Sequence, residues 1–131
     1  MERQHVSTGT PWEALAGYSR AVRVGPFVYV AGTTATNEKG EISSTDPYEQ
    51  TCHILQRVAS ALEAVGASLS HVVRTRVYIT NMDDWQAVAR AHGEVFADIR
   101  PANTLVEVSR LATPDMQVEI EIDAVIPDAS L

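Results

Sequence analysis

Two stretches near the C-terminus decide the fold class: RPANTLVEVSRL at 100–111 and MQVEIEIDAVIP at 116–127. Both alternate apolar and polar residues with a period of two, which is typical of strands with one buried face. In the second stretch the apolar series predicts the face beneath a layer of helices: Val118, Ile120, Ile122 and Ala124. The opposite face carries three carboxylates, Glu119, Glu121 and Asp123. We therefore expect a sheet with one apolar and one charged face, and the charged face needs an explanation.

The rest of the chain supplies the other elements of such a sheet. Residues 20–33 predict two short strands joined at Gly25-Pro26, since glycine and proline interrupt strand pairing. Residues 47–65 carry apolar side chains at helical spacing, and 81–97 begin with the helix-capping sequence NMDD. Between them, 71–80 are rich in β-branched residues and predict a strand. The order β-β-α-β-α-β-β indicates an α+β fold, a two-layer sandwich of a mixed sheet with two helices on one face.

Alternation also assigns side chains to the two faces of the sheet. The remaining side chains expected beneath the helices are Val73, Thr75, Val77, Ile79, Val106 and Val108. Arg74 and Arg76 then lie on the open face, where they can pair with carboxylates of a neighbouring strand. Two interpretations of this face stay open. It is either solvated and crossed by weak ion pairs, or it meets other copies of the protein, with charges paired across the assembly.

Composition is that of an ordinary globular protein. The 131 residues are 45% hydrophobic and 21% charged, so we expect one domain over 1–131. The formal net charge of −7 repels phosphate backbones and acidic lipids, and we expect no nucleic-acid or membrane partner. No apolar run approaches the roughly 18–20 residues of a membrane helix, and the first residues lack the pattern of a secretory signal. Cys52 is the single cysteine, which fits a reducing, cytoplasmic location.

The sequence lacks the motifs of the common cofactor and metal chemistries. It contains no G-x-G-x-x-G, P-loop, H-E-x-x-H or paired cysteines, and we expect no cofactor. The four histidines, His5, His53, His71 and His92, lie far apart, so we expect no metal site. Cys52 falls on the apolar stripe of the first helix, which favours a buried filler over a nucleophile. Any chemistry must use a few polar groups in a cleft, acting on a reactive small molecule or on bound water.

Five short motifs, taken in order, resemble the YjgF/RidA family. They are GYS at 17–19, FVYVAG at 27–32, RTRVY at 74–78, PANTLVEV at 101–108 and VEIE at 118–121. The likeness runs over about 18–125, nearly the whole chain. It implies the chorismate-mutase-like fold of that family, assembled as a homotrimer. The open sheet faces would then gather inside the trimer, with three clefts between neighbouring subunits.

The resemblance also implies an activity and a set of site residues. Characterised deaminases of the family hydrolyse reactive enamines and imines made from amino acids, such as 2-aminoacrylate. In these relatives a glutamate and a bound water assist the addition of water to the C=N bond, and an arginine binds the substrate carboxylate. The matching catalytic residues here are Glu119 and Tyr18. The ligand-binding candidates are Asn103, Thr104, Gly32 and Arg100.

Four departures from the family pattern change what the site can bind. The family arginine is replaced by Asn103, and three other cleft positions hold Ala31, Ala89 and Leu105. A neutral amide binds a carboxylate far more weakly than a guanidinium does. The sequence therefore leaves two functions open: an enamine or imine hydrolase with an altered substrate, or a non-catalytic protein that binds a small metabolite. A ribonuclease activity, attached to some relatives, is disfavoured by the acidic charge.

Each candidate residue also has a structural interpretation. Asn103 can bond its own backbone at the strand entry, and Glu119 can be one member of a charged strand face. Tyr18 can pack by its ring at an interface, and Arg100 can be solvated or interfacial. His92 is interpreted as a satisfied core histidine rather than a general base.

Overall fold

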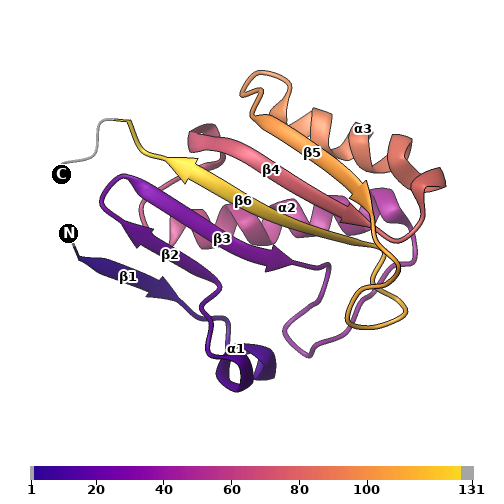
Figure 1. Cartoon of the computed structure of the whole chain (residues 1–131), viewed down its shortest axis with the longest axis horizontal. Coiled ribbons are helices and arrows are strands. Elements are labelled where there is room, and N and C mark those ends of the chain that lie inside the picture. The colour runs from indigo at the N-terminus through magenta and orange to yellow at the C-terminus, as the bar shows by residue number, and fades with distance from the viewer. Residues whose placement is uncertain (1, 128–131) are drawn as a thin grey trace.

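One mixed sheet of six strands organises the computed structural model, which describes residues 2–127 (Figure 1). The strands are β1 (Arg3–Val6), β2 (Ala21–Val24), β3 (Phe27–Thr33), β4 (Val72–Ile79), β5 (Ala102–Glu107) and β6 (Val118–Val125). Their spatial order is β1-β2-β3-β6-β4-β5, in which β4 and β5 are parallel and the other pairs are antiparallel. The predicted α+β fold with a mixed sheet is confirmed.

Two helices cover one face of this sheet, as predicted: α2 (Pro47–Glu63) and α3 (Trp85–Phe96) (Figure 1). The Asp46 side chain accepts a hydrogen bond from the Tyr48 N–H at 2.9 Å and so caps α2. Short 3-10 turns, Leu69–His71 and Met82–Asp84, lead into β4 and α3. None of the helices described in the structure is long and apolar enough to span a membrane.

Two elements near the N-terminus were not predicted, β1 and the short helix α1 (Pro11–Ala16). β1 extends the sheet by pairing antiparallel with β2. Most of its side chains are exposed, so its sequence has no alternating apolar pattern that could reveal it. α1 is too short to show helical periodicity and is followed by Gly17, whose φ of 76° lies in the left-handed region.

The core between sheet and helices contains the predicted face of β6. Val118, Ile120, Ile122 and Ala124 are all buried. The assignments of Val73 and Val106 were wrong, because these side chains are 46% and 39% exposed. An irregularity in the β4–β6 register between Val72 and Arg74 turns Val73 outward. On β5, pairing with β4 directs Leu105 instead of Val106 toward the core.

Candidate active site

A small cavity of about 160 Å³ lies where the loop after β1 and the strands β3 and β6 approach one another. Three of the six predicted site residues line it, namely Tyr18, Gly32 and Glu119. Two arginines that were not predicted, Arg20 and Arg57, line it as well. The structure thus brings residues from four separate segments of the chain into one polar cavity.

Gly32 allows the Glu119 carboxylate to lie close against the backbone of β3. A Cβ atom at position 32 would come within 2.2 Å of Glu119 Oε2, closer than any real contact. The β3–β6 register shifts between Val30 and Thr33, so Gly32 sits in an irregular part of the ladder. Such irregularities are common beside functional sites, because they redirect side chains. Gly32 therefore acts by making space, and this space places Glu119 in the cavity.

Burial raises the pKa of Glu119 above the usual value of a glutamate. The positive charge of Arg20 lowers this pKa, whereas the nearby Glu121 carboxylate raises it further. The net direction is upward, toward the range in which a carboxyl group can both accept and release a proton near neutral pH. Glu119 therefore has the electrostatic setting of a general acid or base.

Arg20 is buried beside Glu119 and is held by neutral groups. Its Nη1 donates to the Gly32 carbonyl at 2.7 Å and to Thr33 Oγ1 at 3.0 Å. Its Nη2 lies 3.4 Å from the Tyr18 hydroxyl, and its guanidinium carbon lies 5.7 Å from the centre of the Tyr18 ring. Arg20 therefore fixes both the glycine backbone and the tyrosine of the cavity.

Glu13 holds the wall of the cavity formed by the loop between β1 and α1. Its carboxylate accepts hydrogen bonds from the hydroxyls of Thr8 at 2.7 Å and Thr10 at 2.9 Å. Burial alone would raise the pKa of Glu13, but the hydrogen bonds from Thr8, Thr10 and Ser7 outweigh burial and lower the pKa to about 2. The ionised Glu13 thus orders the segment that carries Thr10 and Trp12 into the cavity wall.

The other three predicted site residues lie outside this cavity in the single chain. Asn103 Nδ2 donates to Thr75 Oγ1 at 2.8 Å, and Thr75 Oγ1 lies 2.9 Å from His92 Nε2. Asn103 is thus bonded to a side chain of β4 and not to its own backbone. Thr104 is exposed on β5, and Arg100 is exposed between α3 and β5.

His92 matches its interpretation as a histidine satisfied within the fold. Besides the contact with Thr75, its ring lies 4.7 Å from that of Phe96, measured between ring centres. Burial lowers the pKa of His92, which favours the neutral ring. Within residues 2–127, no three histidine, cysteine, aspartate or glutamate side chains gather in a group that could hold a metal ion.

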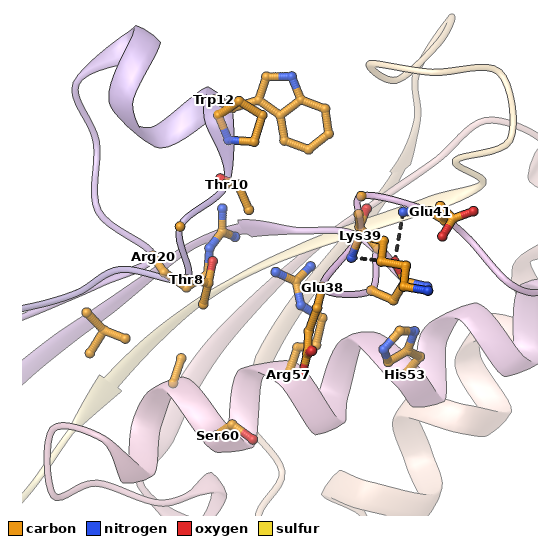
Figure 2. A pocket seen from close by; sticks show the side chains of 17 residues that line it. Thr8, Thr10, Trp12, Arg20, Glu38, Lys39, Glu41, His53, Arg57 and Ser60 are labelled. Carbon is orange, nitrogen blue, oxygen red and sulfur yellow. Dashed lines mark hydrogen bonds between the residues drawn. The ribbon is translucent and has the colours of Figure 1, made fainter.

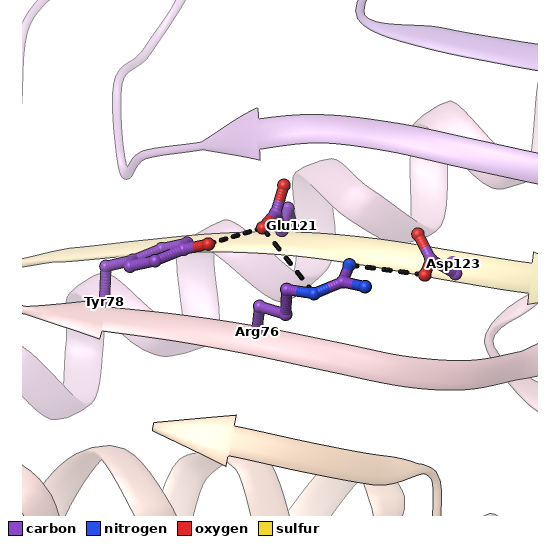
Figure 3. Close-up of polar contacts among 4 residues, drawn as sticks. All are labelled: Arg76, Tyr78, Glu121 and Asp123. Atoms are coloured by element: carbon purple, nitrogen blue, oxygen red, sulfur yellow. Dashed lines mark hydrogen bonds and ion pairs between the residues drawn. The ribbon is translucent and has the colours of Figure 1, made fainter. Parts of the chain in front are cut away.

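The charged face of β6 is crossed by contacts to β4 (Figure 3). Arg76 Nη1 lies 3.2 Å from Asp123 Oδ2, and Arg76 Nε lies 4.0 Å from Glu121 Oε1. The Tyr78 hydroxyl donates to Glu121, and this hydrogen bond raises the pKa of Tyr78. The predicted pairing of arginine and carboxylate across neighbouring strands is therefore present for Arg76.

The roles of Arg20 and Arg57 are only weakly indicated by their positions in the sequence. Arg20 stands next to the first residue of β2, where a charged side chain usually points to solvent. Arg57 follows the buried Ile54 by three positions and precedes the buried Ala61 by four. This spacing places Arg57 on the sheet-facing side of α2, which is the signal that could have identified it.

Comparison with known proteins agrees with the fold and with the motifs. Over residues 8–126 the sequence matches the family model described as Endoribonuclease L-PSP. The fold is that of small α+β proteins with a mixed sheet and two covering helices, and the chain belongs to the YjgF/RidA family.

Several relatives cover nearly the whole chain. An uncharacterized protein of Streptomyces coelicolor is 38% identical over 121 residues, 92% of this chain and 90% of that protein. The 3-aminoacrylate deaminase RutC of Acinetobacter baylyi is 32% identical over 113 residues, 86% of this chain and 88% of that protein. A crystal structure of a YjgF/YER057c/UK114 family member from Mycobacterium tuberculosis superposes with a TM-score of 0.88 at 45% identity, covering 95% of this chain and all of that one.

Proposed function

We propose that the protein is a hydrolase of the enamine and imine deaminase type, acting on a small molecule in the cavity of Tyr18, Gly32 and Glu119. The observation that carries the proposal is the half-buried Glu119 carboxyl group, set against Gly32 beside Tyr18 and Arg20. The similarity to a relative named 3-aminoacrylate deaminase supports this reaction class.

The proposed reaction adds water to a C=N bond and releases ammonia. Glu119 takes a proton from water as the water oxygen bonds to the imine carbon, and passes this proton to the imine nitrogen, which gives a neutral carbinolamine. Glu119 then takes the proton of the carbinolamine hydroxyl group and gives it to the amine nitrogen. The C–N bond breaks as the C=O bond forms, and a carbonyl compound and ammonia leave. Tyr18 and the backbone around Gly32 orient the substrate during both steps.

We place the cleft between subunits of a homotrimer. Phe27 and Tyr29 are 44% and 50% exposed, and Val106 is 39% exposed, so the sheet carries apolar side chains that a single chain leaves uncovered. β5 is an edge strand, so the Asn103, Thr104 and Arg100 region is available to a second copy. Sedimentation equilibrium should give the mass of three subunits, and a clean monomer at micromolar concentration would contradict the trimer.

Ammonia release tests the proposed activity directly. A coupled assay should generate 2-aminoacrylate in place and compare wild type, Glu119→Ala and a reaction without protein. We expect faster ammonia release with wild type and the uncatalysed rate with Glu119→Ala. Because the substrate is altered in this proposal, further imines of amino acids should be tested in the same way. Equal rates with and without protein for all of these compounds would contradict the proposal.

A non-catalytic metabolite-binding protein is the second candidate. It is favoured because Asn103, at the position of the family arginine, already donates its amide hydrogen bond to Thr75. A thermal-shift screen with keto acids, amides and amino acids separates the two candidates. A compound that stabilises the protein and is recovered unchanged supports binding, and conversion of that compound supports the enzyme.

A further inference from the structure

A second and larger cavity, of about 890 Å³, adjoins the Tyr18–Glu119 cavity on the side of α1 and α2 (Figure 2). The two cavities share the side chains of Thr10, Trp12, Arg20, Thr36 and Arg57 in their linings. In Figure 2 the Arg57 side chain rises from α2 toward that of Arg20, and Trp12 lies on the other side of the cavity. The two guanidinium groups therefore stand where the cavities meet.

Neither of these two arginines has a direct ion-pair partner among the described residues, although Glu119 and Glu13 act on them at longer range. Arg20 is only 4% exposed, its hydrogen-bond partners are neutral, and its buried Nε has no hydrogen-bond partner. Arg57 Nη1 donates to the Thr34 carbonyl at 2.7 Å. Across residues 2–127, no carboxylate lies within ion-pair distance of either guanidinium. A charged group taken out of water is stabilised by a counter-charge in direct contact, so an anion bound between the two guanidinium groups would be favoured.

The two charges also act on each other. Burial lowers the pKa of Arg57 from its usual high value and the positive charge of Arg20 lowers it further, whereas the charge of Glu13 acts in the opposite direction. The rest of the larger cavity carries no excess of positive charge, because its lining holds Glu38 and Glu41 against Lys39. The arginine pair is therefore the positive centre of the combined cavity.

We propose that Arg20 and Arg57 form a carboxylate-binding subsite, and that the larger cavity holds the apolar part of the same acid against Trp12. Guanidinium groups bind carboxylates with paired hydrogen bonds, and an indole ring offers a flat apolar surface. The subsite supplies the positive charge that Asn103 lacks, from a different part of the fold. As a substrate site it rests on the proposed function, whereas its binding of an acid can be measured without turnover.

The volume of the larger cavity defines the size of the acid. A cavity of about 890 Å³ falls within the range that holds drug-sized ligands, roughly 300–1,000 Å³. A three-carbon acid would leave most of it empty. The preferred ligand is therefore a monocarboxylic acid with a bulky apolar or aromatic substituent.

Calorimetric titration of the full-length protein tests the subsite with two matched compounds, phenylacetate and its neutral amide phenylacetamide. We expect wild type to bind phenylacetate at least tenfold more tightly than phenylacetamide, in line with about 1.4 kcal/mol per factor of ten. Acetate should bind more weakly than phenylacetate. Equal affinity for the acid and the amide, or no binding of the acid, would overturn the subsite. Equal affinity for acetate and phenylacetate would overturn the role of the larger cavity.

Variants then assign the binding to Arg57. Arg57→Gln should weaken phenylacetate binding at least tenfold and leave phenylacetamide unchanged, and Arg57→Lys should restore part of the loss. Arg90→Gln is the matched control, since Arg90 is an exposed helical arginine that stacks at 4.2 Å on the ring of Tyr48, outside both cavities. Wild-type affinity in Arg57→Gln, or an equal loss in Arg90→Gln, would overturn the assignment.

The two proposals fail in different ways. Tight phenylacetate binding without ammonia release from any imine would contradict the hydrolase and support the subsite. Ammonia release with equal affinity for the acid and the amide would support the hydrolase and overturn the subsite.

Discussion

Two polar clusters in this molecule differ in how their hydrogen bonds are completed. In the Thr75 cluster, Asn103, Thr75 and His92 bond to one another, and His92 also packs on Phe96. In the Tyr18 cavity, the Glu119 carboxyl has no hydrogen-bond partner among the described residues, and Arg20 keeps an unpartnered Nε. The first cluster is joined through Thr75 while Asn103 stays exposed on β5, and the second cluster borders an empty volume.

This difference favours the Tyr18 cavity over the Thr75 cluster as the proposed site. Buried polar groups are almost always satisfied, and a satisfied group adds stability without being available to a ligand. A group that lacks a partner beside a cavity is destabilising unless something else binds there. By this criterion the amide of Asn103, at the family position of the arginine, is engaged by Thr75 although Asn103 is exposed, and the charge that we propose for a carboxylate lies at Arg20 and Arg57.

The largest expected effect is on turnover and comes from Gly32→Ala. The new Cβ displaces Glu119 Oε2, the mobile end of a side chain, so the carboxylate moves while the fold adapts at little cost. A misplacement of about 1 Å in a catalytic group can reduce turnover about 100-fold, and we expect a loss of that size with a nearly unchanged free energy of unfolding. Ammonia release and urea denaturation measure the two quantities.

Gly93→Ala is the matched control, since a Cβ at this α3 position meets no atom within 4 Å. It should keep full turnover and stabilise the helix slightly. Full turnover in Gly32→Ala would show that the placement of Glu119 does not matter.

Thr75→Val should lower stability and leave turnover unchanged, the reverse of the effect expected for Gly32→Ala. Thr75 is fully buried, and the substitution removes the shared partner of Asn103 and His92. We expect a loss of about 1–3 kcal/mol in the free energy of unfolding, with turnover kept at assay temperatures where the protein stays folded. Thr104→Val, on the exposed side of β5, should change stability by less than about 0.5 kcal/mol. A loss of turnover in folded Thr75→Val would place this cluster in the active site.

Glu13 offers a further test of the comparison, because its fully bonded carboxylate holds Thr10, which lines the cavity. Its pKa is about 2 in the folded protein, below the ordinary value of 4.5, so the unfolded chain binds more protons between these pH values. The stability it provides is present above pH 4.5 and is lost as the pH falls toward 2. The free energy of unfolding of wild type should exceed that of Glu13→Gln by about 2 kcal/mol at pH 7. This difference in stability should shrink below pH 4.5. A difference that does not change with pH would contradict this role.

The smallest expected effect concerns the pairs on the open face of the sheet. Arg76→Gln removes contacts to Asp123 and Glu121 between partly exposed side chains. In dilute monomer we expect the substitution to lower the free energy of unfolding by less than about 1 kcal/mol. The difference between wild type and Arg76→Gln should decrease at high salt. A larger loss that grows with protein concentration would mean that this face is buried in an assembly.

Much of the fold could be predicted from periodicity, because the core strands and both large helices bury one face each. The alternating residues of β6 and the apolar stripe of α2 carry that signal directly. β1 was not predicted, because an edge strand with exposed side chains has no such pattern. The predicted face of Val73 was wrong because the β4–β6 register is irregular at this point. The predicted face of Val106 was wrong because β5 has apolar residues on both sides, so alternation alone does not identify its buried face.

The site could be predicted in part. Tyr18, Gly32 and Glu119 were found through motifs, and the structure brings them into one cavity. The role of Gly32 as the space for a carboxylate depends on the pairing of β3 with β6, which no local pattern contains. Arg20 and Arg57 are 37 positions apart in sequence, and only the packing of α2 against the sheet joins them.

A crystal structure determined with pyruvate, the keto acid formed from 2-aminoacrylate, tests most directly which polar cluster is the site. We expect pyruvate in the Tyr18 cavity, with its carbonyl group near Glu119 and its carboxylate facing Arg20 or Arg57. Pyruvate bound beside Asn103 and Arg100, with Glu119 outside its reach, would contradict the account.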